Sequence, residues 1–209
     1  MNTEMLECKR LTVGALYRPM RIDHALLNRI YADITRKYPY SDLKHLPDGI
    51  RMANGNVNDF FVQNNRLQVN EPVEVFHAAK EKAMDLFDMA SRSLNISEFA
   101  ATGVKIIAAI PTGKGEAGNI LLREVFGALG NKFSVLGGGF KGAGLRVVLH
   151  EEAVRQVKIE PFFGDLSSIY IEVDTQYPKP VKKLEEIDEA VNGCYDYIFE
   201  NIAAFFKEL

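Results

Sequence analysis

A glycine-rich run, GGGFKGAG, is the first feature whose residue types and spacing suggest chemistry. It contains the pattern G-x-G-x-x-G at Gly137, Gly139 and Gly142. This pattern holds a dinucleotide pyrophosphate when a strand precedes it and a helix follows, because the helix N-terminus meets the phosphates. Here the strand-like segment LRVVLH follows. We therefore expect an exposed, mobile connection and no nucleotide site, and the alternative is a loop in which Gly138, Gly139 and Lys141 close over a ligand.

The segment IPTGKGEAGN matches a phosphate-binding loop only in part. A Walker loop needs a glycine five positions before its Gly-Lys pair and a serine or threonine after it. Ala108 and Gly115 stand at those two positions. We expect Gly118 and Asn119 to begin a helix here, with anion capture by Lys114 at the helix start as the minor alternative.

Histidine and cysteine form no pattern typical of a metal site or a nucleophile. None of the four histidines has a second histidine or a cysteine at metal-ligand spacing, so we expect no structural metal and no cofactor. Cys8 near the first strand and Cys194 on the apolar side of the last helix are expected to be buried and unreactive. Two cysteines near opposite ends favour a reducing compartment, so we expect a cytoplasmic protein.

The composition is that of a soluble globular chain, with 209 residues, 47% hydrophobic residues, 25% charged residues and a net charge of −3. The start, MNTEMLECKRL, lacks a basic segment followed by an apolar run, and no stretch reaches the roughly 18 apolar residues of a membrane span. We expect neither secretion nor a membrane. From Lys182 onward the chain holds three basic and seven acidic residues, which argues against nucleic-acid binding there.

An internal repeat indicates how the elements are organised. Residues 11–38 align with 106–133 without a gap, and each copy begins with an alternating strand followed by a short amphipathic helix. The match resumes in later strands and in a long helix. We therefore predict a first repeat over 1–95 and a second over 96–209, joined in one two-lobed unit. The predicted fold is α+β, with two similar halves of strand, helix, strands and helix, largely antiparallel sheets, and helices on one face.

The expected strands lie near 6–17, 48–54, 58–64, 66–71, 99–110, 132–137, 144–150, 154–161 and 168–177. The expected helices lie near 23–37, 73–94, 117–130 and 183–206. On the two long helices, apolar residues recur every three or four positions, which predicts one buried stripe on each. The stripe residues are Phe76, Ala79, Ala83, Phe87, Ala90 and Leu94, and Leu184, Ile187, Val191, Tyr195, Ile198 and Ile202.

Helices on one face of a sheet leave the other face to water, a ligand or a partner. In the second half, the apolar residues of 145–149, 157–159 and 169–173 are expected on the covered face. The polar residues between them then point the other way. These are Arg146, Lys158, Glu160, Tyr170, Glu172 and Asp174. Opposite charges on neighbouring strands commonly just stabilise an exposed sheet. The alternative is a ligand-binding surface, and its candidate residues are Arg146, Lys158, Glu160, Tyr170, Glu172, Gly138, Gly139 and Lys141.

One long segment, residues 143–206, carries a family resemblance. It contains KIEPFFGDLSSIYIEVDTQ, then a spacer and a long helix with YIFENI. This order resembles a sporadically distributed family of uncharacterised prokaryotic proteins, which implies a bacterial cytosolic setting and no particular activity. The two copies of strand, helix, strands and helix also resemble the duplicated saddle of the TATA-binding protein. Fold does not transmit function, and the acidic balance argues against a DNA role.

Three functions follow from these expectations. The first is a non-catalytic binding or interaction module, as a homodimer or with a protein or small-ligand partner, that uses the sheet faces or the cleft between the halves. The second is a small-molecule enzyme in that cleft, using Glu160, Arg146 and Lys158 or the glycine-rich run. The third is nucleic-acid binding on the sheet. A deep cluster of the charged residues favours the enzyme, and a shallow surface with an apolar patch favours the interaction module.

Overall fold

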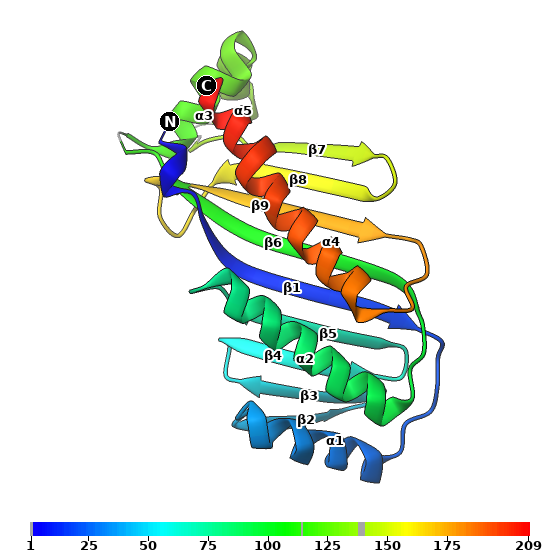
Figure 1. Ribbon diagram of the computed structural model, residues 1–209. Helices are drawn as coiled ribbons and strands as arrows, with labels where there is room; N and C mark the ends of the chain where they lie inside the picture. The colour runs from blue at the N-terminus through cyan, green and yellow to red at the C-terminus, as the bar shows by residue number, and fades with distance from the viewer. Residues whose placement is uncertain (1, 114, 138–140) are drawn as a thin grey trace.

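The computed structural model describes residues 2–113, 115–137 and 141–209, and within them the fold is α+β with one antiparallel sheet of nine strands (Figure 1). The strand order is β2-β3-β4-β5-β1-β6-β9-β8-β7. The strands are β1 (Glu7–Tyr17), β2 (Asp42–Leu46), β3 (Gly49–Asn54), β4 (Asn58–Gln63), β5 (Arg66–Pro72), β6 (Phe99–Pro111), β7 (Leu145–His150), β8 (Val154–Pro161) and β9 (Ser168–Tyr177).

The helices lie in the two connections that follow β1 and β6 and at the end of each half. A short 3₁₀ turn (Thr3–Met5) precedes β1. The others are α1 (His24–Lys37), α2 (Phe76–Leu94), α3 (Ala117–Leu121), a π-helical turn (Leu122–Phe126), a 3₁₀ segment (Gly127–Leu136), α4 (Leu184–Tyr197), a second π-helical turn (Ile198–Ile202) and α5 (Ala203–Lys207). The long helices α1, α2 and α4 lie on the same face of the sheet (Figure 1). This arrangement confirms the predicted fold class.

Strands β1 and β6 pair at the centre of the sheet, with Leu11 opposite Ile106 and Val13 opposite Val104. All four of these side chains are completely buried under the helices. The alternating pattern that predicted two strands therefore places one apolar side of each in the core. The elements of both halves follow the order strand, helix, strands, helix, as the repeat predicts. The duplication itself stays a prediction.

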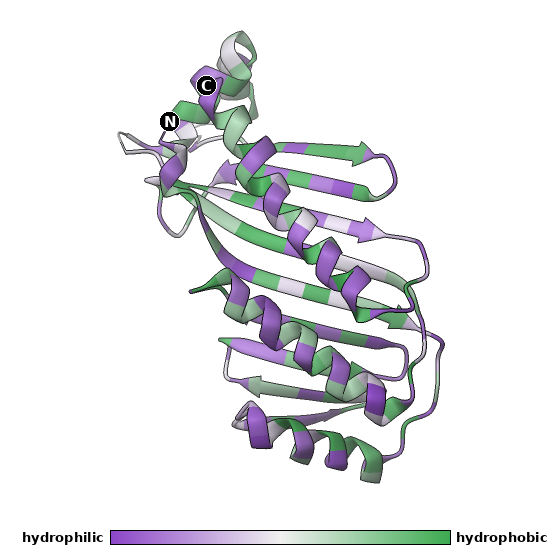
Figure 2. Cartoon of the chain, viewed as in Figure 1, coloured by the Kyte–Doolittle hydropathy of each residue, from purple (hydrophilic) through white to green (hydrophobic). Residues whose placement is uncertain are grey.

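The predicted stripes on the long helices are buried with few exceptions. Ala83, Phe87, Val191 and Ile198 are completely buried, while Phe76 and Tyr195 are half-buried. The last two stack on each other with ring centroids 3.9 Å apart, so they join α2 to α4 above the sheet. The outward faces of α1, α2 and α4 are hydrophilic, as expected for amphipathic helices on a sheet (Figure 2).

One predicted strand is wrong, and one strand of the structure was not predicted. The segment near 132–137, expected as a strand, lies in the 3₁₀ segment that ends at Leu136. A short apolar run such as KFSVL fits a strand and a helical segment equally well. Strand β2 was missed because its sequence, DLKHL, is mostly polar, and a polar edge strand carries no clear alternation.

The apolar side of β7 is also less covered than expected. Leu145 and Val147 are half-buried, and Leu149 is 37% exposed. Their neighbours Val157 and Ile159 on β8 are buried as predicted. The connection after β6 forms short helical segments at the end of the sheet where both chain termini lie, and not a helix over β7 (Figure 1).

Candidate functional site

The face of the sheet without helices carries a groove of about 570 Å³, which we call the sheet groove. It runs over β5, β1, β6 and β9, the four central strands. Its lining includes apolar and small residues as well as amide and charged groups. These residues are Thr12, Gly14, Ala15, Leu16, Arg66, Gln68, Asn70, Ala101, Thr102, Gly103, Lys105, Val154, Asp174, Gln176, Tyr177 and Pro178.

Two glycines form the floor of the sheet groove. Gly14 on β1 lies directly opposite Gly103 on β6. Gly14 is flanked by Gln68 of β5, and Gly103 is flanked by Gln176 of β9. One row across the sheet is therefore Gln68, Gly14, Gly103 and Gln176, in which two long amide side chains stand on either side of bare backbone.

The fold does not require glycine at either position. A Cβ atom on Gly14 would lie 3.9 Å from its nearest neighbours, and a Cβ on Gly103 would lie 3.9 Å from the carbonyl oxygen of Thr175. Both distances are ordinary van der Waals contacts, and neither glycine has a positive φ. Glycine inside a strand weakens the strand and often marks close approach of a ligand or another backbone. The pair therefore makes the sheet groove the candidate site.

A polar network borders the glycine row in the first half. Thr12 Oγ1 donates to Asn70 Oδ1 over 2.7 Å, and Asn70 Nδ2 donates to Asp59 Oδ1 over 2.5 Å. Arg51 Nε then donates to Asp59 Oδ2 over 2.8 Å. The network fixes the amide of Asn70 at the groove edge, because both its oxygen and its nitrogen are engaged. A partner that binds here meets preorganised polar groups.

In the second half, the charges next to the groove are paired. Lys105 Nζ lies 3.1 Å from Asp174 Oδ2 and 3.9 Å from Glu172 Oε1. Glu172 Oε2 also accepts a 2.7 Å hydrogen bond from the hydroxyl of Tyr170. Burial, followed by this bond to Glu172, raises the pKa of Tyr170, so the phenol stays protonated at neutral pH.

The predicted site residues of β7, β8 and β9 do share the uncovered face, at the side of the groove. Arg146 lies opposite Lys158, and Lys158 lies opposite Glu172. Glu160 lies opposite Tyr170, and Lys158 Nζ lies 3.2 Å from Glu160 Oε1. Arg146 donates to Gln156. These groups satisfy one another on an open surface, as in an ordinary exposed sheet, and do not converge in a deep pocket.

The glycine-rich run is only partly described. Gly138 and Gly139 lie outside the described residues, and Lys141 is exposed. We expected an exposed, mobile connection, but Gly142 is closely packed. A Cβ at this position would lie 2.8 Å from both Gly118 Cα and Pro161 Cγ. Gly118 in turn would place a Cβ 2.1 Å from the carbonyl oxygen of Lys141. Gly118 and Gly142 thus let residues 141–142 pack directly against the start of α3.

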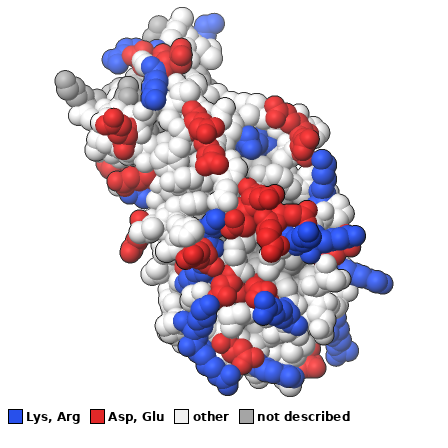
Figure 3. Space-filling model, in the orientation of Figure 1, with Lys and Arg blue, Asp and Glu red and all other residues white. Residues whose placement is uncertain are grey.

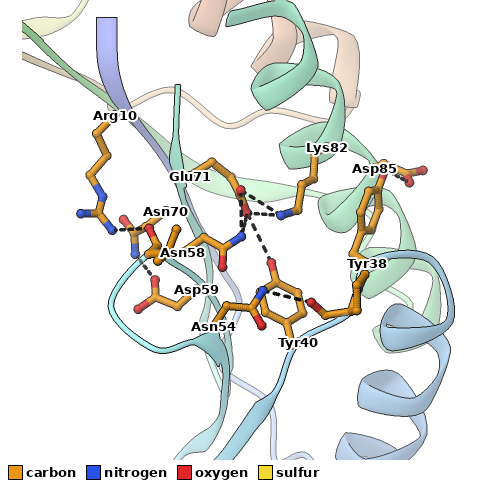
Figure 4. Close-up of polar contacts among 12 residues, drawn as sticks. Arg10, Tyr38, Tyr40, Asn54, Asn58, Asp59, Asn70, Glu71, Lys82 and Asp85 are labelled. Carbon is orange, nitrogen blue, oxygen red and sulfur yellow. Dashed lines mark hydrogen bonds and ion pairs between the residues drawn. The ribbon is translucent and has the colours of Figure 1, made fainter. Parts of the chain in front are cut away.

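A second polar cluster lies beneath α2 on the covered face (Figure 4). The carboxylate of Glu71 on β5, 5% exposed, lies 2.8 Å from Lys82 Nζ of α2. It also accepts a hydrogen bond from Asn58 Nδ2 at 3.2 Å and one from the hydroxyl of Tyr40 at 3.4 Å. Among the described residues Asn58 Oδ1 has no hydrogen-bond partner. These contacts join β5 to α2, so we assign the cluster to holding α2 on the sheet.

Both cysteines are buried, as expected, and lie under the helices, away from the sheet groove. Burial raises the pKa of the Cys8 thiol to about 12, and the neighbouring Cys194 thiol adds to this. Burial likewise raises the pKa of Cys194 to about 11. A thiol must ionise to act as a nucleophile, so neither cysteine is suited to catalysis.

The folded protein should therefore resist thiol alkylation. At pH 8, iodoacetamide is expected to leave Cys8 and Cys194 unmodified in buffer and to modify both in denaturant, because only unfolding exposes and ionises them. Intact mass measured over time checks this. Rapid modification of the folded chain would contradict the burial of the thiols.

Within residues 2–113, 115–137 and 141–209, no three histidine, cysteine, aspartate or glutamate side chains are placed so that they could hold a metal ion together. None of the described helices is both long and apolar enough to span a membrane. When the chain is compared with protein-family models and with characterised proteins, nothing matches it. The geometry of the sheet groove is therefore the basis for a functional assignment.

The glycine pair was not predicted from the sequence. Gly14 and Gly103 each interrupt an alternating strand, in LTVGALY and TGVKIIAAI. That interruption is a signal for close backbone approach. What the sequence could not provide was the register that sets one glycine opposite the other.

Proposed function

We propose that the protein is a non-catalytic interaction module that binds a segment of another protein across the sheet groove. The observation that supports this most directly is the facing pair Gly14 and Gly103, which keeps backbone bare where the fold has room for side chains. A segment crossing the sheet there approaches more closely than any side chain on the floor would permit. Gln68 and Gln176 stand on both sides; Gln176 and the side-chain oxygen of Gln68, whose nitrogen donates to Asn70 Oδ1, can bond main-chain amides.

The character of the lining favours a protein segment over nucleic acid. Leu16 is 45% exposed at one end of the groove, next to the small Ala101. Of the two cations that line the groove, Lys105 already faces Asp174, and Arg66 donates to the side-chain oxygen of Gln63. Phosphate binding needs a surplus of Lys and Arg along the path of the backbone. A surface with apolar, amide and paired charged groups is typical of protein interfaces.

The lining also favours binding over catalysis. General acid-base or nucleophilic catalysis needs a group of suitable pKa in reach of a substrate in a recess that excludes water. The groove is open, its lining carboxylate Asp174 lies in an ion pair with Lys105, and both cysteines are on the other face. Its four central strands instead form a rigid platform, which suits recognition.

The experiment is selection from a random peptide library displayed on phage, using the purified protein as bait. Peptides that bind wild type are then measured against Gly103→Trp by fluorescence anisotropy. We expect a loss of affinity of at least about tenfold, because the indole would occupy the floor of the groove. The matched control is Gly193→Trp on α4, where the glycine is exposed and a Cβ meets nothing within 4 Å. This variant is expected to bind as wild type does.

Two results would contradict the proposal. One is a library that yields no peptide above background. The other is a set of peptides that bind Gly103→Trp as tightly as wild type. Short single-stranded and duplex DNA are measured in parallel, and DNA binding that Gly103→Trp abolishes would assign the groove to nucleic acid.

The glycine pair also makes a prediction about stability. Gly14→Ala and Gly103→Ala are each expected to raise the free energy of unfolding by about 0.5–1 kcal/mol, because alanine has less backbone freedom to lose and fits without strain. Urea denaturation measures this. The control is Gly49→Ala, which should destabilise, because a Cβ there would lie 2.0 Å from the carbonyl oxygen of Val62. Destabilisation by both floor substitutions would mean that the fold itself requires these glycines.

A further inference from the structure

The strand β7 forms one outer edge of the sheet and is open to pairing. Its ladder is made with β8 alone, and in the part of the chain that the structure describes no strand lies on its other side. Bonded and non-bonded pairs alternate along an antiparallel ladder, so every second residue of β7 turns its N–H and C=O away from β8. Such unpaired backbone groups are satisfied in full only by water or by another extended chain.

The side chains of β7 leave this edge unusually unprotected. The strand reads LRVVLH, in which Val148 is 58% exposed and Leu149 is 37% exposed. Exposed apolar edge strands are rare in monomers, because they pair with other chains. The features that block such pairing are charged side chains, proline and a covering element, and β7 has only Arg146 and the terminal His150.

The opposite edge of the same sheet provides a comparison. Strand β2 carries Asp42, Lys44 and His45 within five residues. Helix α1 also lies beside it, with the rings of His24 and His45 5.3 Å apart. The two edges of one sheet thus differ: β2 is charged and has α1 beside it, whereas β7 is apolar and no strand of the described residues lies on its outer side. This difference indicates that β7 has a partner.

We propose that the partner is a second copy of the chain, which pairs through its own β7 so that two nine-stranded sheets become one continuous sheet. A twofold axis perpendicular to the sheet keeps the helix sides of both copies on one side. Antiparallel pairing centred on Val147 then sets Leu145 of each copy opposite Leu149 of the other. The apolar side chains on the helix side of β7 therefore face apolar side chains of the second copy, and the register places none of them against a polar residue.

The same register also suits the side chains on the face of the sheet without helices. In this register Arg146 of one copy lies opposite Val148 of the second copy, so no two like charges face each other directly. Exposed Val148 gains an apolar contact with the stem of the arginine. The groove over β5, β1, β6 and β9 stays free, so this inference is independent of the proposed function.

The first test is sedimentation velocity over a dilution series with wild type and Val148→Lys. We expect a concentration-dependent dimer for wild type and at least about a tenfold weaker dimer for the variant. The introduced ammonium would face Arg146 of the second copy. The control is Val57→Lys in the turn between β3 and β4, a valine of similar exposure at 60%, which should dimerise as wild type does.

The second test reads the register by disulfide formation. Val147→Cys should form a disulfide-linked dimer under mild oxidation, because opposed residues of antiparallel strands lie within disulfide reach. Val148→Cys should crosslink far more slowly, because its counterpart is a diagonal neighbour about 7–8 Å away. The native Cys8 and Cys194 are buried and do not interfere.

Three outcomes would overturn the inference. These are a monomer at every concentration, a dimer that Val148→Lys does not weaken, and faster crosslinking through Val148→Cys than through Val147→Cys. Gly103→Trp should leave the dimer unchanged. Loss of peptide binding and loss of dimerisation are therefore separate results, and each proposal can fail without the other.

Discussion

Replacing Ile198 with alanine is expected to lower the free energy of unfolding by about 2–5 kcal/mol. Ile198 is completely buried, at the point where α4 continues into a π-helical turn. The π-helical turn widens the helix locally and is held in place by packing, so the surroundings have little freedom to collapse into the space that a truncation leaves. Urea denaturation followed by circular dichroism measures the change.

The control for this prediction is Glu200→Ala in the same π-helical turn. Glu200 is exposed, so its removal should change stability by no more than about 0.5 kcal/mol. Equal melting temperatures for Ile198→Ala and wild type would place the stripe of α4 outside the core.

The second large effect is expected at the buried cluster around Glu71. Lys82→Met should cost about 3 kcal/mol, because it leaves a carboxylate that is only 5% exposed without its cation. The cost should stay at the lower end of the range for broken buried pairs. Asn58 and Tyr40 still donate hydrogen bonds to the same carboxylate (Figure 4).

A double-mutant cycle separates the charge from the packing of the lysine stem. In a Glu71→Gln background the neutral amide needs no cation, so Lys82→Met should there cost less than half as much. The same cost in both backgrounds would mean that Lys82 acts through its contacts with the rings of Tyr38 and Tyr40 instead.

Most of the fold could be predicted from the sequence, because its signals are local. The strands that hold Val13 and Ile106 alternate cleanly between apolar and polar residues, and the helices that hold Phe87 and Val191 repeat at helical spacing. Burial of these residues in the structure follows directly. The errors lie where the local signal is weak, in the polar edge strand DLKHL and in the short apolar run KFSVL.

The candidate site could be predicted only in part, because it depends on register. The alternation in β8 and β9 was sufficient to place Lys158 and Glu172 on the uncovered face. Residue type alone then favoured the charged side chains as ligand groups. The structure pairs those charges with each other, and it sets Gly14 opposite Gly103, which lie in different halves of the chain. No local pattern reports which residues of distant strands become neighbours.

Charge on the helix side agrees with the proposal that the binding surface lies on the other face. Acidic and basic side chains are mixed over α1, α2 and α4, and no continuous basic field appears in this view (Figure 3). Lys80 of α2, for example, lies 2.9 Å from Asp188 of α4. The helix side is thus occupied with contacts between its own elements.

The central pairing of β1 with β6 also determines when the sheet can be completed. During synthesis β1 leaves the ribosome with α1 and β2 to β5, so it can pair with β5 at once. Its other edge stays open until β6 emerges after α2, and Leu11 then finds Ile106 across a long intervening chain. Closing so long a loop is slow, which predicts refolding in the range of about milliseconds to seconds. Until that late step the nascent first half presents β1 with one unpaired edge, and exposure of this edge to chaperones and to self-association is the kinetic consequence of a sheet whose central pairing forms last.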